Sequence, residues 1–448
     1  MIRETNISTI TIISFFLLVS ILIGWFASRK GDAEGFLVAN RKLGLFQSVM
    51  TLSGTFVGAM TLLVYTAFVF TFGISALWIF IGYFVGFLLF TPFAIYLYKY
   101  SKDKNFYTIA DFFKLRFGRN ISILVITIIF LWYFGSLSAQ FIGGGKILSE
   151  LTGLSFNISA IIMCGSIVFY LILGGFRSVV RTDVFQFIVL GIILIILTLA
   201  IRQGLQVPIE YFNPFNAGIV NITAFFLLGV MAPFATQDYW QRIFAMKNVK
   251  VVKNAFVSSG ILVLLVSFIL TYIGLVARSL FSDIDADMAV IHSFTQLAPD
   301  YLTGFVAIAF FAAILSTADT YLFLLSVNFT NDIAGHFVPD SRSKIKAIRL
   351  AIFIIGGLAL LLALIYPNIV DITIIFKAIG LTVSPIVIIA WFSRGNRIAI
   401  VASITLTTLI IITLSVMGFV KPELAFVGIF GGFIFYLLAV LLVRILGK

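Results

Sequence analysis

The chain has 448 residues, of which 61% are hydrophobic and 11% are charged, and its net charge is +12. A water-soluble domain is roughly 45–50% apolar and about 25% charged, so this composition excludes a soluble globule, and it is too hydrophobic for a disordered chain. One cysteine and two histidines are too few for a disulfide framework or a cysteine–histidine metal site. The basic residues are scattered between apolar runs, which indicates a protein embedded in a lipid bilayer and not a nucleic-acid partner.

Apolar runs long enough to cross a bilayer follow one another along almost the whole chain. A helix needs about 20 apolar residues to span the hydrocarbon core. The runs are continuous and do not alternate with polar residues, so they predict helices and not the strands of a barrel. We expect an all-α polytopic protein with about thirteen transmembrane helices, at residues 8–27, 45–70, 73–98, 121–148, 157–173, 179–201, 221–241, 254–278, 301–329, 347–366, 369–392, 398–418 and 423–445.

The basic residues test this count. When the segments between the spans are numbered alternately, one set holds 24 Lys and Arg residues and the other set holds 4. Cytoplasmic loops carry the excess of Lys and Arg in membrane proteins. The predicted topology therefore places the N-terminus outside and the C-terminus in the cytoplasm of a cell membrane.

Two of the spans are interrupted by residues that break helices. Residues 53–61 place two glycines and three hydroxyls in the middle of the second span, and residues 229–238 contain a glycine, Pro233 and a polar cluster. Unwound backbone at membrane depth lines a cavity for ions or substrate, and matching breaks in two halves indicate an inverted repeat. The alternative is that the small residues only let helices pack closely.

The ninth span carries a carboxylate, Asp319, two residues after a pair of hydroxyl residues, Ser316 and Thr317. A buried carboxylate is costly in a membrane and marks a functional site by default. Hydroxyls together with carbonyls of an unwound helix suit sodium, although the hydroxyls could instead bond to the preceding turn of their own helix.

Two further charged residues leave alternatives open. Asp183 could pair with Arg181, bind a second cation or act as a gate. Lys377 lies within the eleventh span, where it could pair with Asp319, bind a substrate carboxylate or extend its charge to the membrane surface.

Five motifs in this order resemble the sodium:solute symporter family, which includes proline, pantothenate, sialic-acid and sodium/glucose transporters. They are FLVANR at residues 36–41, YTIADFF with RFG at 107–113 and 116–118, GGFRS with TDVFQ at 174–178 and 182–186, QDYWQR with Ala245 and Lys247 at 237–247, and STADT at 316–320.

The resemblance implies a leucine-transporter-type fold, a 5+5 inverted repeat with broken first and sixth core helices. The implied segments are an extra N-terminal helix with a cytoplasmic linker (1–44), the first repeat (45–201), an extracellular loop (202–220), the second repeat (221–392) and two C-terminal helices (393–448).

The resemblance also implies the sites. The main sodium site would use the carbonyls of Gly54, Val57 and Ala313 with the hydroxyls of Ser316 and Thr317, and a second cation site would involve Asp183, Asp319 and Thr320. The substrate would bind near Thr55, Phe56, Gln140, Phe234 and Lys377. The stretch AQFIGGGK at 139–146 resembles pantothenate permeases and favours a small carboxylate-bearing solute, although its glycines could serve helix packing alone.

The predicted function is sodium-coupled uptake of a small organic solute by alternating access, with sodium as the coupling ion and no enzymatic reaction. Two alternatives stay open: a proton-coupled symporter of the same fold, in which Asp319 or Asp183 would titrate, and a membrane sensor that signals to a separate partner. The sequence predicts neither the substrate's identity nor the oligomeric state.

Overall fold

The computed structural model describes residues 7–28, 33–104, 106–201, 207–281, 284–297, 299, 302–333, 341–393 and 395–446. Over this part of the chain the secondary structure is helical, with one isolated bridge between Leu43 and Met246. The membrane class and the leucine-transporter-type fold predicted from sequence are confirmed.

The first half of the chain supplies the first core helices. Its elements are α1 (Ile7–Ser28), α2 (Ala33–Val38), α3 (Leu45–Phe56), the π-helix η2 (Met60–Tyr65), α4 (Thr66–Phe72), η3 (Gly73–Leu77), α5 (Trp78–Lys104), α6 (Ile109–Phe117), α7 (Arg119–Thr152) and α8 (Phe156–Ile201). The two predicted spans at 157–173 and 179–201 form the single element α8, which kinks at Gly175, where φ is +64°.

The second half repeats the pattern with a broken helix at its start. Its elements are η4 (Ile209–Phe212), α9 (Gly218–Ala235), α10 (Gln237–Ala245), α11 (Val249–Leu280), η5 (Ala286–Met288), α12 (Ala289–Leu297), α13 (Thr303–Asn328), η7 (Phe329–Ile333), α14 (Ser341–Ile365), α15 (Ile369–Leu381), α16 (Val383–Phe392), α17 (Arg397–Val416), α18 (Leu424–Phe426), η9 (Val427–Gly431) and α19 (Gly432–Ile445).

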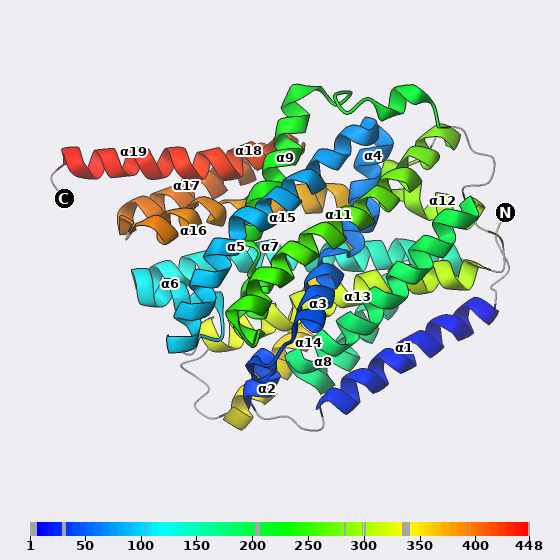
Figure 1. Cartoon of the computed structure of the whole chain (residues 1–448), viewed down its shortest axis with the longest axis horizontal. Helices are drawn as coiled ribbons and strands as arrows, with labels where there is room; N and C mark the ends of the chain where they lie inside the picture. Colours follow the sequence, from blue (N-terminus) through cyan, green and yellow to red (C-terminus); the bar gives the residue numbers. More distant parts are fainter. Residues whose placement is uncertain are drawn as a thin grey trace.

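Ten helices among the described residues are long and apolar enough to cross a membrane, and two shorter apolar helices accompany them. The exact number of thirteen spans stays a prediction. In Figure 1, α1 and α19 lie at opposite edges of the helical assembly, so the elements at the two ends of the chain flank the core helices.

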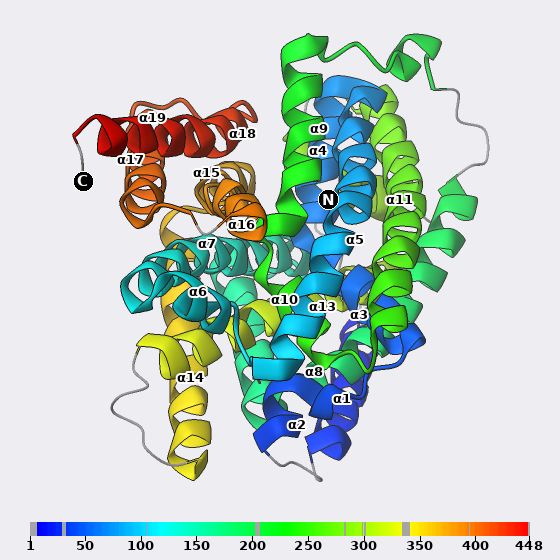
Figure 2. The same ribbon diagram turned by 60° about the vertical axis from the view of Figure 1, so that its left-hand side comes forward.

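Helices α5, α9 and α11 run side by side, as Figure 2 shows. Glycines set the close approach of α5 and α9, because a Cβ at Gly229 would lie 2.2 Å from the carbonyl oxygen of Ile79, and one at Gly82 would lie 2.2 Å from that of Phe226. Gly229 therefore serves helix packing, which is the alternative left open for the seventh span.

Both predicted helix breaks are present. Helix α3 ends at Phe56 and regular structure resumes at the π-helix η2, and α9 ends at Ala235 before α10 begins at Gln237. The second break lies within the predicted segment 229–238: α9 continues through Pro233 and ends where Thr236 adopts an extended backbone (φ −73°, ψ 104°). A proline is tolerated inside a membrane helix where neighbouring groups satisfy the backbone that it leaves unpaired, and here α9 ends at Ala235, two residues after Pro233.

Candidate functional site

Two side chains support the break in the first core helix. The Oε1 atom of Gln140 on α7 accepts a hydrogen bond from the backbone N–H of Ala59 (2.8 Å), and the Thr61 hydroxyl donates to the carbonyl of Phe56 (2.6 Å). These bonds satisfy backbone groups that the break releases from the helix, which is required where no water reaches them. Gln140 therefore positions the unwound segment. The sequence analysis predicted only that it lies near the substrate.

The unwound segment lies directly against α13. An ideal Cβ at Gly58 would lie 2.3 Å from the Thr317 hydroxyl oxygen and 2.7 Å from the Thr317 Cβ. Contacts shorter than 3.0 Å do not occur for real Cβ atoms, so only glycine fits at this position. The glycine thus brings the backbone of the broken helix to the two hydroxyl residues of α13.

Five oxygens meet at this contact, and we call them the α3–α13 oxygen cluster: the carbonyl oxygens of Gly54, Thr55 and Ala313, and the hydroxyl oxygens of Ser316 and Thr317. The Ser316 hydroxyl lies 3.1 Å from the Gly54 carbonyl and 3.0 Å from that of Ala313. The Thr317 hydroxyl lies 3.0 Å from the Thr55 carbonyl and 3.2 Å from that of Ala313.

The cluster joins four of the five predicted sodium ligands. It adds the Thr55 carbonyl, which the sequence analysis placed only in the substrate pocket, and the Val57 carbonyl stays a prediction. The hydroxyls bond to the preceding turn of their own helix, which is the alternative left open for this motif, and also to carbonyls of α3; sodium ligation by them stays a prediction. Neutral oxygen donors from an unwound helix and an adjacent helix fit a sodium ion, and the searched residues contain no cluster of His, Cys, Asp or Glu for another metal.

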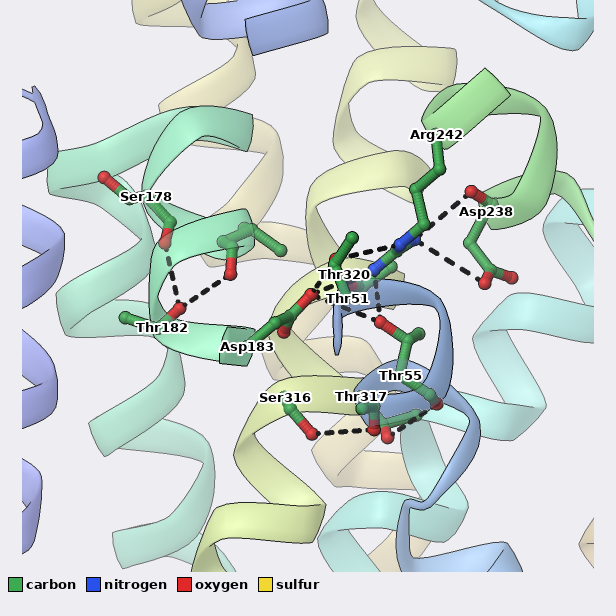
Figure 3. Close-up of polar contacts among 12 residues, drawn as sticks. Thr51, Thr55, Ser178, Thr182, Asp183, Asp238, Arg242, Ser316, Thr317 and Thr320 are labelled. Atoms are coloured by element: carbon green, nitrogen blue, oxygen red, sulfur yellow. Dashed lines mark hydrogen bonds and ion pairs between the residues drawn. The ribbon is translucent and has the colours of Figure 1, made fainter. Parts of the chain in front are cut away.

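The predicted second cation site contains an arginine. The side chains of Asp183 and Arg242 are both 0% exposed, and Nη2 of Arg242 lies 3.0 Å from Oδ2 of Asp183. The same nitrogen donates to the hydroxyls of Thr55 and Thr320, the latter at 3.2 Å, and the Thr51 hydroxyl donates to Asp183 (2.5 Å). Figure 3 shows the guanidinium between these groups. Asp183 therefore pairs with an arginine 59 residues away in sequence.

The other edge of the guanidinium faces the start of α10. Nη1 of Arg242 donates to the Asp238 carbonyl (3.2 Å) and lies 3.6 Å from the Asp238 carboxylate. The Tyr133 hydroxyl of α7 donates to this carboxylate (2.5 Å), and Nε of Arg242 donates to the Thr51 hydroxyl (3.0 Å). Arg242 thus joins α10 to α3, α8 and α13.

Arg242 is the principal residue that the sequence analysis missed, because it was counted among the basic residues of the cytoplasmic loops. The available signal was its spacing from Asp238, four residues earlier, directly after a broken helix. Of the alternatives left open for Asp183, ion pairing occurs, but with Arg242 and not with its neighbour Arg181.

A cavity of about 50 Å³ adjoins the oxygen cluster. Four of the predicted substrate residues are among those that line it: Thr55, Phe56, Gln140 and Lys377. The structure does not bring Phe234 to this cavity, because its ring packs edge-on against Phe90 in the core at 5.3 Å.

A second cavity of about 60 Å³ continues from the first. The two share Phe56, Met60, Thr61, Tyr83 and Lys377, and the second extends to Pro422. It reaches a segment that the charge distribution predicts to be extracellular.

Lys377 supplies a positive charge between the two cavities. Its ammonium nitrogen lies 5.5 Å from the centre of the Tyr83 ring. The ion pairs of the described residues do not include Lys377, and Asp319, its predicted alternative partner, is fully buried on α13. The Asp238 carboxylate, which accepts a hydrogen bond from Tyr133 and lies 3.6 Å from Arg242, lines the 50 Å³ cavity together with Lys377.

The chain is similar in sequence to two bacterial transporters over almost its whole length. The chain is 24% identical to the osmoregulated proline transporter OpuE of Bacillus subtilis (strain 168), over 99% of this chain and 96% of that protein. It is also 24% identical to a sodium/proline symporter of Staphylococcus aureus (strain Newman), over 96% of this chain and 89% of that protein.

Solved structures show the same fold. The substrate-bound outward-open structure of a Na⁺-coupled sialic acid symporter matches with a TM-score of 0.81 at 17% identity, over 97% of this chain and 98% of that one. The closed structure of Mhp1, a nucleobase-cation-symport-1 family transporter, matches with a TM-score of 0.61 at 13% identity, over 91% and 94% of the two chains.

A family model decides the assignment. The model of the sodium:solute symporter family matches residues 36–207 and 208–425, which together cover most of the chain. The match confirms the predicted coupling ion, sodium, and a transport function for a multi-pass membrane protein. The chain belongs to the sodium:solute symporter family.

Proposed function

We propose that this protein takes up a small carboxylate-bearing solute together with sodium, by alternating access across the cell membrane. The observation that carries the proposal is the position of Lys377, whose charge faces the cavities beside the α3–α13 oxygen cluster without a carboxylate partner among the described residues. The two proline-transporting relatives support a carboxylate on the substrate, and L-proline is the first solute to test.

The sodium ion would bind at the α3–α13 oxygen cluster. There it would receive lone pairs from the hydroxyls of Ser316 and Thr317, which in its absence donate to the neighbouring carbonyls. Thr55 and Thr317 belong to the α3–α13 oxygen cluster and also line the adjoining cavity of about 50 Å³. Sodium would therefore fix the wall of the substrate pocket, and ion and solute would strengthen each other's binding.

The proposed orientation places the N-terminus outside and the C-terminus in the cytoplasm. The cavity that reaches Pro422 would then be the extracellular route to the substrate site. The five-helix repeats at 45–201 and 221–392, the flanking segments 1–44 and 393–448 and the extracellular loop at 202–220 complete the proposed organisation.

Uptake by proteoliposomes that contain only this protein tests the proposal. We expect an inward sodium gradient to drive uptake of radiolabelled L-proline or pantothenate, and Lys377→Met to abolish uptake while the folded protein is still stabilised by sodium. Lys421→Met is the matched control, because Lys421 also lies over an aromatic ring, that of Phe419 at 5.7 Å, but outside the cavities that contain Lys377.

The same assay separates the alternatives. Uptake that persists without sodium and rises in acid would establish proton coupling instead. A protein that binds solute without moving it would be a sensor. Full uptake by Lys377→Met would refute the role of the lysine in recognising a carboxylate.

A further inference from the structure

We infer that the membrane surface of this protein carries a site for an anionic phospholipid, in a groove between the starts of α7 and α17. Arg119 and Arg397 would bind the phosphate of the headgroup, and apolar side chains of α17 would hold an acyl chain. The site depends neither on the transported solute nor on the coupling ion. On the proposed orientation it faces the cytoplasmic leaflet of the membrane.

The groove lies between two helices that are far apart in the chain, and Figure 2 shows α17 beside α7. Its volume is about 710 Å³, which is within the range of about 300–1,000 Å³ for sites that bind drug-sized molecules. The groove therefore has room for part of a lipid and not only for an ion. Its lining consists of residues 117–121 at the end of α6 and the start of α7 and residues 397, 398, 401, 402, 405 and 406 of α17.

One wall of the groove is an apolar face of α17. Ile398, Val401 and Leu406 are 57%, 43% and 44% exposed, and their spacing places them on one side of the helix. Because α17 is a candidate membrane span, side chains exposed on this side contact lipid. From Arg397 to Leu406 the helix rises about 14 Å, which is about half of the 30 Å hydrocarbon core. An acyl chain of one leaflet therefore fits along this wall.

The end of the groove at the start of both helices carries two arginines. A Cβ added at Gly118 would lie 3.9 Å from Cζ and Nη2 of Arg397, and Arg119 is the next residue in the chain. The ion pairs of the described residues include neither arginine, and the described residues that line the groove include no Asp or Glu. Arginine binds phosphate oxygens through paired N–H donors, and basic pockets at the cytoplasmic ends of membrane helices bind lipid headgroups.

The local backbone brings the two arginines together. Gly395 has a φ of +63°, and a Cβ at this position would lie 3.1 Å from the Phe117 ring, so the turn before α17 packs directly on the end of α6. Helix α7 begins at Arg119 without a side-chain cap, and the free N–H groups of its first turn add positive potential to that of the guanidiniums.

The cavity next to the groove is less suited to an anion. Its volume is about 510 Å³, and Arg119 lines both spaces. Besides Lys114 and Lys344, the carboxylates of Asp111 and Asp332 line this cavity, and negative charges repel a phosphate. The headgroup is therefore assigned to the side of Arg119 that faces α17.

Binding of short-chain lipids to the purified full-length protein in a neutral detergent tests the inference. Dioctanoyl phosphatidylglycerol is anionic, whereas dioctanoyl phosphatidylcholine has the same chains and no net charge. We expect the anionic lipid to bind more tightly in calorimetric titrations and to raise the unfolding temperature more, and equal binding of the two lipids would overturn the inference. Inorganic phosphate is the third probe, and an affinity equal to that of the anionic lipid would overturn the role of the acyl chain.

Variants locate the site. Loss of one basic residue at a membrane surface weakens binding about fivefold, so Arg119→Gln/Arg397→Gln should bind phosphatidylglycerol about 25-fold more weakly. Both arginines are exposed, so this variant should fold. Ala402→Trp keeps the arginines but fills the groove, and it should also weaken binding. Arg349→Gln is the matched control, because Arg349 is an exposed arginine of α14 outside the groove.

An unchanged affinity for phosphatidylglycerol in the folded double variant would refute the headgroup site, and an unchanged affinity in Ala402→Trp would refute the position of the chain. An equal loss in Arg349→Gln would show a general attraction of anionic lipid to the basic surface and would likewise overturn the inference.

Discussion

A methyl group added at Gly58 tests the proposed sodium site from the backbone side. In Gly58→Ala the new Cβ would lie 2.3 Å from the Thr317 hydroxyl oxygen, 2.7 Å from its Cβ and 2.9 Å from its Cγ2. The Thr317 Cβ is fixed to helix α13, so a change of side-chain rotamer cannot remove the overlap. The broken helix and α13 must separate, and the α3–α13 oxygen cluster opens.

The expected effect of Gly58→Ala has two parts, a loss of folding stability and a loss of sodium affinity. Overpacking of a well-packed interior costs roughly 1–3 kcal/mol, and this loss of stability appears in sodium and in potassium alike. The second part is specific to sodium. If one hydroxyl ligand is lost, and its contribution is similar to that of a hydrogen bond to a charged group, about 1.5–3 kcal/mol, sodium binds about ten- to a hundredfold more weakly.

Thermal unfolding in sodium and in potassium, at one ionic strength, separates these parts. Gly357→Ala is the matched control, because a Cβ at Gly357 in α14 meets no atom within 4 Å, and this variant should keep the full sodium effect. The reasoning is refuted if Gly58→Ala retains the apparent sodium affinity of the wild type.

Two further substitutions address the neighbouring groups. Ser316→Ala removes one hydroxyl of the cluster. At a sodium concentration of about 100 times the dissociation constant, sodium stabilises the folded wild-type protein by about 2.7 kcal/mol, and this stabilisation should fall by more than 1 kcal/mol in the variant. The difference between the unfolding free energies in sodium and in potassium measures it. Gln140→Leu leaves the Ala59 N–H without its 2.8 Å partner and should lower the free energy of unfolding by about 1–3 kcal/mol in both salts; an effect seen in one salt alone would contradict the role of Gln140 in supporting the helix break.

The sequence predicted those features that follow from local composition. Apolar runs are long enough to identify membrane helices, and glycines with hydroxyls in the middle of a run identified the first break. The second break was predicted within residues 229–238, and it lies at Thr236, three residues after Pro233. A proline marks the region where a helix is weakened, whereas the residue at which it ends depends on contacts with helices far away in sequence.

Prediction of the site residues was limited in the same way, because their roles depend on contacts between distant parts of the chain. Ser316 and Thr317 are adjacent in sequence, and their neighbourhood alone suggested oxygen ligands. The spacing of Arg242 from Asp238 could have separated it from the loop arginines, but its pairing with Asp183, 59 residues away in sequence, depends on how α10 packs against α8. Gln140 was placed near the substrate, but its bond to the Ala59 backbone, 81 residues away, depends on how α7 packs against the broken helix.

In the proposed mechanism, the guanidinium of Arg242 and the sodium ion have different effects on the movement of the helices. Arg242 is covalently part of α10, and it bonds to residues of α3, α8 and α13. Sodium would join α3 to α13 only while bound, through the Gly54 and Thr55 carbonyls and the hydroxyls of Ser316 and Thr317. Only the mobile charge can change the relative stability of two conformations, because a ligand shifts an equilibrium by its differential affinity for them. In the proposed mechanism, sodium binding at the α3–α13 oxygen cluster therefore couples the sodium gradient to the opening of the substrate pocket.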